Sequence, residues 1–260
     1  MSSAAAGGGV RYERTGSAAV LTIDRPERRN AVDGPAAEAL RDGLARFEAD
    51  DGARVLVLTG AGGEAFCAGA DLKALDTLAP GIDGEDGPLG FTRVTPTKPT
   101  IAAVSGWCLA GGLELAAWCD LRIAAQGSTF GCAERRWGVP LIDGGTQRLP
   151  HILGLGRALD LILTGRMVSA EEALALGLVT EVVDAGRHLD RALEIAEGLA
   201  GFPQETMLSD RRAVYEGLGV TLAEGLRREA RIGTASSPVG ERGARRFAGG
   251  EGRGGAGTGI

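Results

Sequence analysis

The segment that decides the fold reads Thr100-Ile101-Ala102-Ala103-Val104, then Gly106, then the helix-like residues 113–119, then Leu121-Arg122-Ile123-Ala124. Its first part is a continuous apolar run of the kind that forms buried parallel strands. The order of strand, glycine loop, helix and strand is typical of a βαβ unit, whose crossover is right-handed. We therefore predict an α/β fold with a parallel sheet at its centre.

The flanking sequence extends this pattern in both directions. Residues 10–24 contain two short β-type runs and predict a hairpin that ends before Pro26. Residues 35–48 place apolar side chains at helical spacing, and residues 54–59 form a second buried strand. Beyond Gly138 helices dominate. We expect them over residues 158–164, 169–177, 189–199, 205–215 and 222–230, with one more strand at 178–183.

The two ends of the chain differ in composition from its centre. Residues 1–9 are small and polar, and residues 249–260 are mostly glycine, alanine and charged residues, so both ends are predicted to be flexible. Between them we predict an α/β core over residues 10–198 and a helical C-terminal module over residues 199–248.

The overall composition argues against several classes of protein. The chain has 260 residues, of which 44% are hydrophobic, so it can bury a large core. Its formal net charge of −6 gives no reason to bind nucleic acid or an anionic membrane. The first residues fit neither a secretory signal nor a transit peptide, and no apolar run is long enough to span a bilayer. The four cysteines include no C-x-x-C pair, as is typical of reduced thiols, and we expect a cytoplasmic protein.

Two common kinds of site find little support in the sequence. The only histidines, His151 and His188, accompany no nucleophile motif and no cluster of ligands, so we expect neither a catalytic triad nor a metal site. Residues 60–65 match the loose G-x-G-x-x-A pattern of a nucleotide-binding loop, but a second small-residue loop follows where that motif requires a helix. We interpret residues 60–65 as a glycine-rich turn.

Two glycine-bearing segments far apart in sequence share a feature that suits catalysis. They read Cys67-Ala68-Gly69-Ala70-Asp71 and Ala110-Gly111-Gly112-Leu113-Glu114. In each, backbone amides at the end of a βα connection lack helical partners, and a ligand can approach closely. Two such amides aimed at one carbonyl oxygen stabilise the negative charge that develops on it. For either segment alone, the alternative is that the glycines only allow tight packing.

Two glutamates accompany these segments. Glu114 lies in an apolar helix, where a solvated glutamate is out of pattern, and Glu134 follows a small apolar segment. Paired carboxylates in a partly dry site can have their pKa values pushed apart, so that one donates a proton while the other activates water. For Glu134 an ion pair with Arg135 or Arg136 remains an equal alternative.

The ordered motifs resemble those of the crotonase superfamily, the enoyl-CoA hydratases and isomerases. The resemblance covers nearly the whole chain. It is carried by Ile23-Asp24-Arg25-Pro26, Asn30-Ala31, residues 66–72, residues 101–106, residues 111–115, Cys119-Asp120, Phe130-Gly131, Gly144-Gly145-Thr146-Gln147-Arg148-Leu149, Leu163-Thr164-Gly165 and residues 175–179.

The resemblance implies a ββα spiral core with a helical C-terminal trimerisation module. It also implies that the amides of Ala70 and Gly111 form an oxyanion hole for a coenzyme A thioester. Glu114 and Glu134 match the two glutamates that hold one water in the hydratases, where Glu114 favours attack at Cβ and Glu134 delivers a proton to Cα. The implied activity is that of a hydro-lyase in fatty acid metabolism. It needs no permanently bound cofactor, and CoA enters as part of the substrate.

The same resemblance assigns contacts to the CoA moiety and an assembly state. Ala68, Ala70 and Leu72 would line the adenine pocket, and Arg28 or Arg29 would approach the phosphates. Phe247 occupies the position of an aromatic residue that closes the CoA site of a neighbouring subunit in a homotrimer or dimer of trimers.

The sequence departs from the hydratase pattern at Leu141-Ile142-Asp143, where those enzymes carry Pro-Gly-Ala. The bulk of Ile142 at the border of the acyl pocket is expected to change the accepted acyl shape. Asp143 is either a turn or helix-cap residue or an auxiliary catalytic group. Double-bond isomerisation or Asp143-assisted chemistry is therefore an alternative to hydration, and a non-catalytic acyl-CoA binder is a weaker one. The glycine- and proline-rich residues between 75 and 99 predict a mobile loop over the acyl chain.

Overall fold

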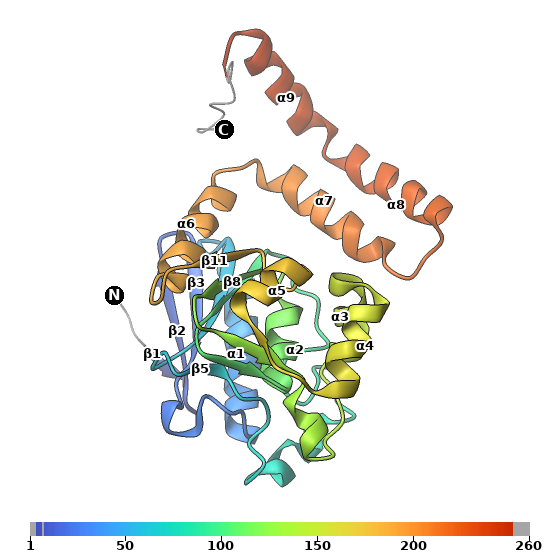
Figure 1. Cartoon of the computed structure of the whole chain (residues 1–260). Coiled ribbons are helices and arrows are strands. Elements are labelled where there is room, and N and C mark those ends of the chain that lie inside the picture. The colour runs from blue at the N-terminus through green and yellow to red at the C-terminus, as the bar shows by residue number, and fades with distance from the viewer. Residues whose placement is uncertain (1–3, 7, 252–260) are drawn as a thin grey trace. The chain divides into compact units, whose positions relative to one another are not determined.

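A computed structural model describes residues 4–6 and 8–251 of the chain (Figure 1). The chain divides into two compact units, Met1–Ala196 and Glu197–Ile260, and the division falls within helix α6 (His188–Ala200). Among the described residues, none of the helices combines the length and the hydropathy that a membrane-spanning segment needs.

A seven-stranded sheet forms the centre of the first unit, in the order β1-β2-β3-β4-β6-β8-β11. The strands from β3 to β11 run parallel, whereas β1, β2 and β3 pair antiparallel. Their bounds are Ala4–Ala6, Val10–Thr15, Ala18–Ile23, Val55–Gly60, Thr100–Val104, Leu121–Ala125 and Glu181–Val183. The apolar runs of β4 and β6 are buried on both faces, which is the reason that they lack polar alternation. The predicted hairpin and parallel strands are thus confirmed, and β1 adds an edge strand within the N-terminal segment for which flexibility was expected.

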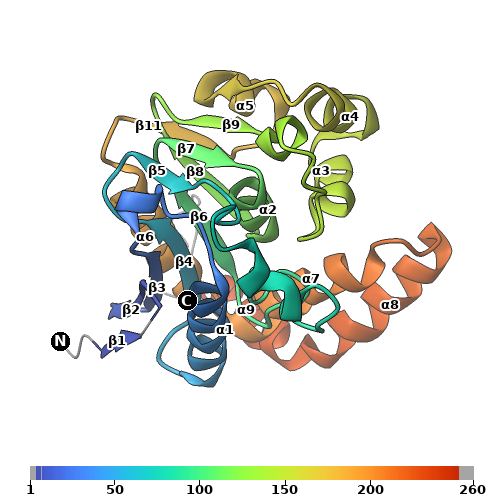
Figure 2. The same ribbon diagram turned by 90° about the horizontal axis from the view of Figure 1, so that it is seen from below.

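A second sheet, in the order β10-β9-β7-β5, was not expected from the residue pattern. Its strands span Val168–Ser169, Thr129–Gly131, Trp107–Leu109 and Ala65–Cys67. Each of β4, β6 and β8 is followed along the chain by one strand of this sheet, so that β5, β7 and β9 lie in a layer next to β6 and β8 (Figure 2). The repeating unit is therefore ββα, as the family resemblance implied, and not the plain βαβ unit that the apolar runs indicated.

The helices of the first unit begin and end where local signals place them. They are α1 (Gly34–Ala49), α2 (Gly111–Trp118), α3 (Gly145–Leu153), α4 (Leu155–Thr164) and α5 (Ala170–Leu176), with short 3-10 helices η1 (Pro26–Arg28), η2 (Leu75–Gly81) and η3 (Ala133–Arg136). The Ser169 hydroxyl caps α5 by accepting a hydrogen bond from the Glu172 amide, and Gly177 ends that helix in the left-handed region. The residue pattern did not predict α3, because two glycines at its start, Gly144 and Gly145, and a proline within it, Pro150, are not typical of a helix.

The second unit consists of helices, α7 (Gln204–Gly217), α8 (Leu222–Ala235) and α9 (Ser237–Ala248), coloured orange to red in Figure 1. Helices α7 and α8 pack together, and the Ser209 hydroxyl donates to the Ile232 carbonyl (3.3 Å). Residues 249–251 form a turn on α9, and the rest of the predicted C-terminal tail lies outside the described residues.

Candidate active site

The two glycine-bearing segments meet in space. Gly69 has φ +95, and a Cβ built on it would lie 2.9 Å from the Gly111 nitrogen and 2.9 Å from the Ala110 Cβ. A Cβ built on Gly112 would lie 2.0 Å from the Cys67 carbonyl oxygen. Contacts below 3.0 Å require the backbone to move, so both positions need glycine if the segments are to touch.

The backbone bends sharply where α2 begins. Ala110 adopts φ 52 and ψ −127, outside the regions that L-residues favour. Its amide donates to the Gly131 carbonyl (2.9 Å), which holds this conformation. Strain of this kind persists only where the surroundings impose it and is concentrated at functional sites. Gly111, the next residue, opens α2, so its amide lies in the first turn of the helix, where an amide has no intrahelical acceptor.

Two backbone amides are left available at this junction. In the described part of the chain, neither the Ala70 amide nor the Gly111 amide is paired with an acceptor. Both residues line one cavity. A pair of unpartnered amides at a helix start can bind a carbonyl oxygen and stabilise charge on it.

Glu114 is held in the wall of the same cavity by backbone amides. Its side chain is 3% exposed, and Oε1 accepts hydrogen bonds from the amides of Gly145 (2.7 Å) and Asp143 (3.0 Å). A Cβ built on Gly145 would lie 2.9 Å from Glu114 Oε1, so the second glycine of the Gly144-Gly145 pair makes room for the carboxylate. Burial raises the pKa of Glu114 to about 8, and the negative charges of Asp143 and Glu134 contribute to the increase.

Glu134, in η3, is buried, and its carboxylate has no partner in the described part of the chain. It is 5% exposed, and neither carboxylate oxygen has a hydrogen-bond partner among the described residues. Among the described residues, Glu134 forms no ion pair with Arg135 or Arg136. The Arg135 guanidinium donates to the Ile162 carbonyl instead, and the Arg136 guanidinium donates to the Gly165 carbonyl. Burial raises the pKa of Glu134 above its ordinary value. A buried carboxylate with both oxygens unsatisfied calls for a water or a ligand beside it.

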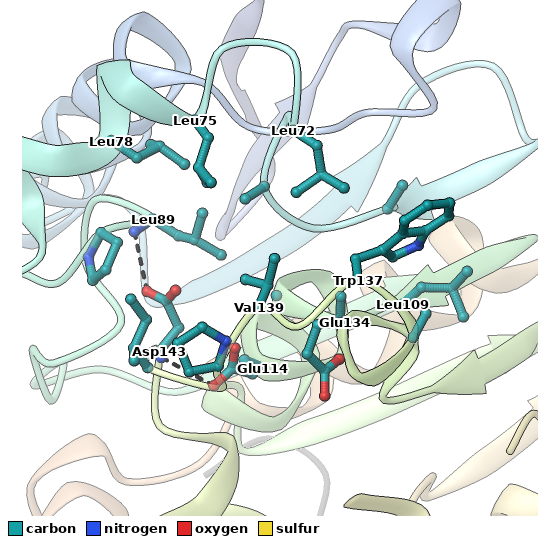
Figure 3. A pocket seen from close by; sticks show the side chains of 18 of the residues that line it. Leu72, Leu75, Leu78, Leu89, Leu109, Glu114, Glu134, Trp137, Val139 and Asp143 are labelled. Carbon is teal, nitrogen blue, oxygen red and sulfur yellow. Dashed lines mark hydrogen bonds between the residues drawn. The ribbon is translucent and has the colours of Figure 1, made fainter. Parts of the chain in front are cut away.

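The cavity has a volume of about 310 Å³ and is mostly apolar (Figure 3). Glu114, Glu134 and the two amides share it with a set of hydrophobic side chains. The lining includes the predicted residues Ala68, Ala70, Leu72, Gly111, Ile142 and Asp143, together with Leu75, Leu78, Ile82, Pro88, Leu89, Leu109, Trp137, Val139 and Pro140. A cavity of this size, with few polar groups that converge, is typical of a small-molecule site.

The sequence interpretation missed the cavity residues that come from the segment between residues 75 and 99, which includes η2. A mobile loop was expected there, but Leu89 and Phe91 are buried and the Phe91 ring packs against Trp118 at 4.4 Å between centroids. The segment is thus a packed wall of the cavity. Its signal was the set of apolar residues among the glycines and prolines, which have no regular period because most of the segment forms turns and one short 3-10 helix.

The arginines predicted to contact CoA are not among the residues that line the cavity. Arg29 pairs with Glu64 on the surface, although its carbonyl accepts a hydrogen bond from the Ala68 amide (3.1 Å) and so places the Arg28–Arg29 turn beside the Ala68 segment. Phe247 belongs to α9 in the second unit and is 63% exposed.

Two further observations concern the nucleotide-binding loop and the metal site that were considered from the sequence. Residues 60–65 turn directly into β5 and not into a helix, which contradicts a dinucleotide-binding loop. Within the ranges that the structure describes, no group of three or more His, Cys, Asp or Glu residues is placed to hold a metal ion.

The fold and the site define a class: an α/β protein with a ββα spiral, in which two buried glutamates and two amides, unpaired within the described residues, line one apolar cavity. The comparison with known families agrees with this class, since the enoyl-CoA hydratase/isomerase model matches residues 13–247. The chain belongs to the enoyl-CoA hydratase/isomerase family, the crotonase superfamily.

Individual relatives are similar over most of their length. A probable enoyl-CoA hydratase of Rhizobium meliloti is 42% identical, over 85% of this chain and 86% of that protein. A short-chain-enoyl-CoA hydratase of Clostridium acetobutylicum is 36% identical, over 80% of this chain and 82% of that protein. The crystal structure of an enoyl-CoA hydratase from Mycobacterium tuberculosis superimposes with a TM-score of 0.85 at 36% identity, covering 93% of this chain and 96% of that one.

Proposed function

We propose that the protein is an enoyl-CoA hydratase, which adds water across the 2,3 double bond of a 2-enoyl-CoA to give a 3-hydroxyacyl-CoA. The observation that carries the proposal is the pair of unpartnered oxygens on buried Glu134, in the same cavity as Glu114 and the amides of Ala70 and Gly111. The family and the names of the similar proteins support the same reaction.

The proposed chemistry assigns one task to each group. The amides of Ala70 and Gly111 donate hydrogen bonds to the thioester oxygen, so that the conjugated alkene becomes electrophilic at Cβ. Glu114 and Glu134 hold one water between them. Glu114 takes a proton from the water as the water oxygen bonds to Cβ. Glu134 gives a proton to Cα as the enolate collapses. Because the amides contact the oxygen most strongly when it is negative, they stabilise the transition state more than the substrate.

The remaining assignments of this proposal rest on the resemblance. They are the contacts of Ala68, Leu72 and Arg28 with CoA, the closure of a neighbour's site by Phe247, a homotrimer or dimer of trimers, and a cytoplasmic location. The exposed apolar side chains of the second unit, among them Leu222 and Phe247, are compatible with burial in an assembly.

The pH dependence of the reaction is the first testable consequence. The reactive glutamate pair carries one proton, because a doubly ionised pair has no acid and a doubly protonated pair has no base. Burial raises the pKa values of both carboxyls, that of Glu114 to about 8. We therefore expect kcat/KM to follow a bell-shaped curve that declines above pH of about 8 and whose acid limb lies above the range of an ordinary carboxyl. A rate that keeps rising beyond pH 9 would contradict this assignment.

A panel of acyl-CoA thioesters tests the reaction itself. The substrates are straight and branched 2-enoyl-CoA esters and their 3-enoyl isomers, incubated in water labelled with ¹⁸O and deuterium. Hydration places ¹⁸O at Cβ and deuterium at Cα, whereas isomerisation moves the double bond without incorporating oxygen. Saturated acyl-CoA esters serve as controls for binding alone. Binding of the esters without any turnover would favour a non-catalytic acyl-CoA binder.

A further inference from the structure

The carboxylate of Asp143 is used for contacts with a distant segment. Oδ1 accepts hydrogen bonds from the Leu89 amide (3.0 Å) and from the Thr92 hydroxyl (2.5 Å). The side chain is 5% exposed, and in Figure 3 its carboxylate points toward the main chain of Leu89. It does not cap α3, whose N-cap residue is Gly144 without a side-chain hydrogen bond. The helix-cap interpretation of Asp143 is therefore wrong, whereas its place in a bend before Gly144 fits the turn interpretation.

The main chain of Asp143 connects the same residue to the candidate catalytic group. Its amide donates to Glu114 Oε1 (3.0 Å). Its carbonyl accepts from Arg148, whose guanidinium also donates to the Thr92 carbonyl. Asp143 therefore binds both Glu114 and the segment 89–92. The Arg148 side chain binds the carbonyls of Asp143 and Thr92 and so stabilises the same contact.

The segment held by Asp143 forms the wall beside the two free amides. Leu89 is buried and lines the cavity, and a Cβ built on Gly111 would lie 2.7 Å from its Cδ1 atom. The other end of the segment has an independent anchor, since the Trp118 indole donates to the Val94 carbonyl (2.7 Å). Loss of the Asp143 carboxylate therefore frees the Leu89 amide and the Thr92 hydroxyl, while the Thr92 carbonyl stays bound to Arg148 and the end of the segment stays attached to α2.

We propose that Asp143 is a positioning residue, whose carboxylate holds the 89–92 segment as the wall of the acyl site and keeps Glu114 and the Gly111 amide in register with it. The inference rests on the proposed hydratase function, in which Glu114 and Gly111 act on the thioester. It assigns Asp143 no proton transfer, and the observations that carry the positioning role are the two donors on its Oδ1 oxygen. The acyl selectivity of the enzyme then depends on this aspartate through Leu89.

The charge of Asp143 has a second effect on the pair. The groups that face Glu114 are Asp143, from the loop before α3, and Glu134, from η3. Arg93 and Arg148 face Asp143 and partly offset its charge. Because Asp143 is negative and close, its charge favours the protonated form of Glu114 and raises the pKa of that carboxyl. A neutral residue of the same shape removes this repulsion.

Three variants separate positioning from catalysis. Asp143→Asn keeps an acceptor oxygen for Leu89 and Thr92 but removes the charge, Asp143→Ala removes both, and Thr92→Val removes one of the two donors. The matched control is Asp83→Asn, an exposed aspartate in the segment between η2 and β6. We expect Asp143→Ala to lower kcat by roughly tenfold to a hundredfold, as misplacement by an ångström does in other enzymes. Asp143→Asn should regain most of that loss, with the alkaline limb of its kcat/KM profile shifted to lower pH, and Thr92→Val should lie between.

Amide hydrogen exchange gives a readout that needs no turnover. Peptides that cover residues 87–92 should exchange faster in Asp143→Ala than in wild type, and at nearly the wild-type rate in Asp143→Asn. Equal inactivity of the Asn and Ala variants, with the segment still protected in both, would identify Asp143 as a catalytic acid and overturn the inference. Unchanged exchange and unchanged acyl-chain preference in the Ala variant would overturn it as well. If the wild type hydrates no ester of the panel, the proposed function fails, while the exchange data still decide whether Asp143 anchors the wall.

Discussion

Glu134→Gln is expected to lower kcat for hydration of a 2-enoyl-CoA by about 10²–10⁴-fold, the usual contribution of a positioned acid or base. The amide can hold a water but delivers no proton to Cα. Stability should not fall, because the substitution removes a buried carboxylate that has no hydrogen-bond partner among the described residues. Both kcat and the midpoint of thermal unfolding should be measured, together with the affinity for a saturated acyl-CoA, which is expected to stay near that of wild type.

Glu114→Gln provides the companion measurement. A glutamine oxygen can still accept from the amides of Asp143 and Gly145, so the fold of this wall is retained while the base is lost. Glu229→Gln, at an exposed position of α8, controls for the loss of one negative charge. Full hydratase activity in either cavity variant would refute the assigned mechanism. Loss of hydration with retained double-bond isomerisation would move the assignment to the isomerase reaction.

Gly112→Ala is expected to reduce kcat/KM by roughly 10²–10³-fold, which is the cost of losing one oxyanion donor. The new methyl group would lie 2.0 Å from the Cys67 carbonyl oxygen, a backbone atom, so α2 must move away from the Ala70 segment. The amides of Ala70 and Gly111 then no longer converge on one point. The affinity for a saturated acyl-CoA should fall less than the rate, because the oxyanion contact is strongest in the transition state.

Gly156→Ala is the matched control for this substitution. Gly156 is also the second residue of a helix, α4, and a Cβ at that position meets no atom within 4 Å. Alanine at an open helical position stabilises by about 0.5–1 kcal/mol relative to glycine, so the control should unfold at the same or a higher temperature and keep wild-type activity. Similar activity of the two alanine variants would show that close contact between α2 and the Cys67 segment is not needed for catalysis.

Part of the fold was readable from local patterns. The continuous apolar runs of β4 and β6 announce strands buried on both faces, and the capping signals of α5 set its ends within a residue. The second sheet was not readable from these patterns, since β5, β7 and β9 each contain three residues. Runs so short carry no periodicity, and they become strands only because each pairs with another in the folded chain.

The candidate site divides in the same way. Residue type and position in sequence singled out Glu114, Glu134, Ala70 and Gly111, because acids in apolar settings and glycines before a helix are unusual wherever the chain folds. The sequence left open whether Glu134 is paired with an arginine. The structure answers this, since the guanidinium groups of Arg135 and Arg136 instead donate to the carbonyls of Ile162 and Gly165.

The two glycine-bearing segments illustrate what the sequence determined and what the tertiary structure decided. The sequence by itself determined the family, the parallel sheet and the residue types available to a thioester, because these depend on composition and on spacing along the chain. Only the tertiary structure decided that Gly69 touches Gly111, that Asp143 binds Leu89, and that Glu134 is without a partner in the described part of the chain. The reason is physical: a hydrogen bond depends on distances of about 3 Å between groups that the sequence separates by tens of residues, and such distances exist only after packing.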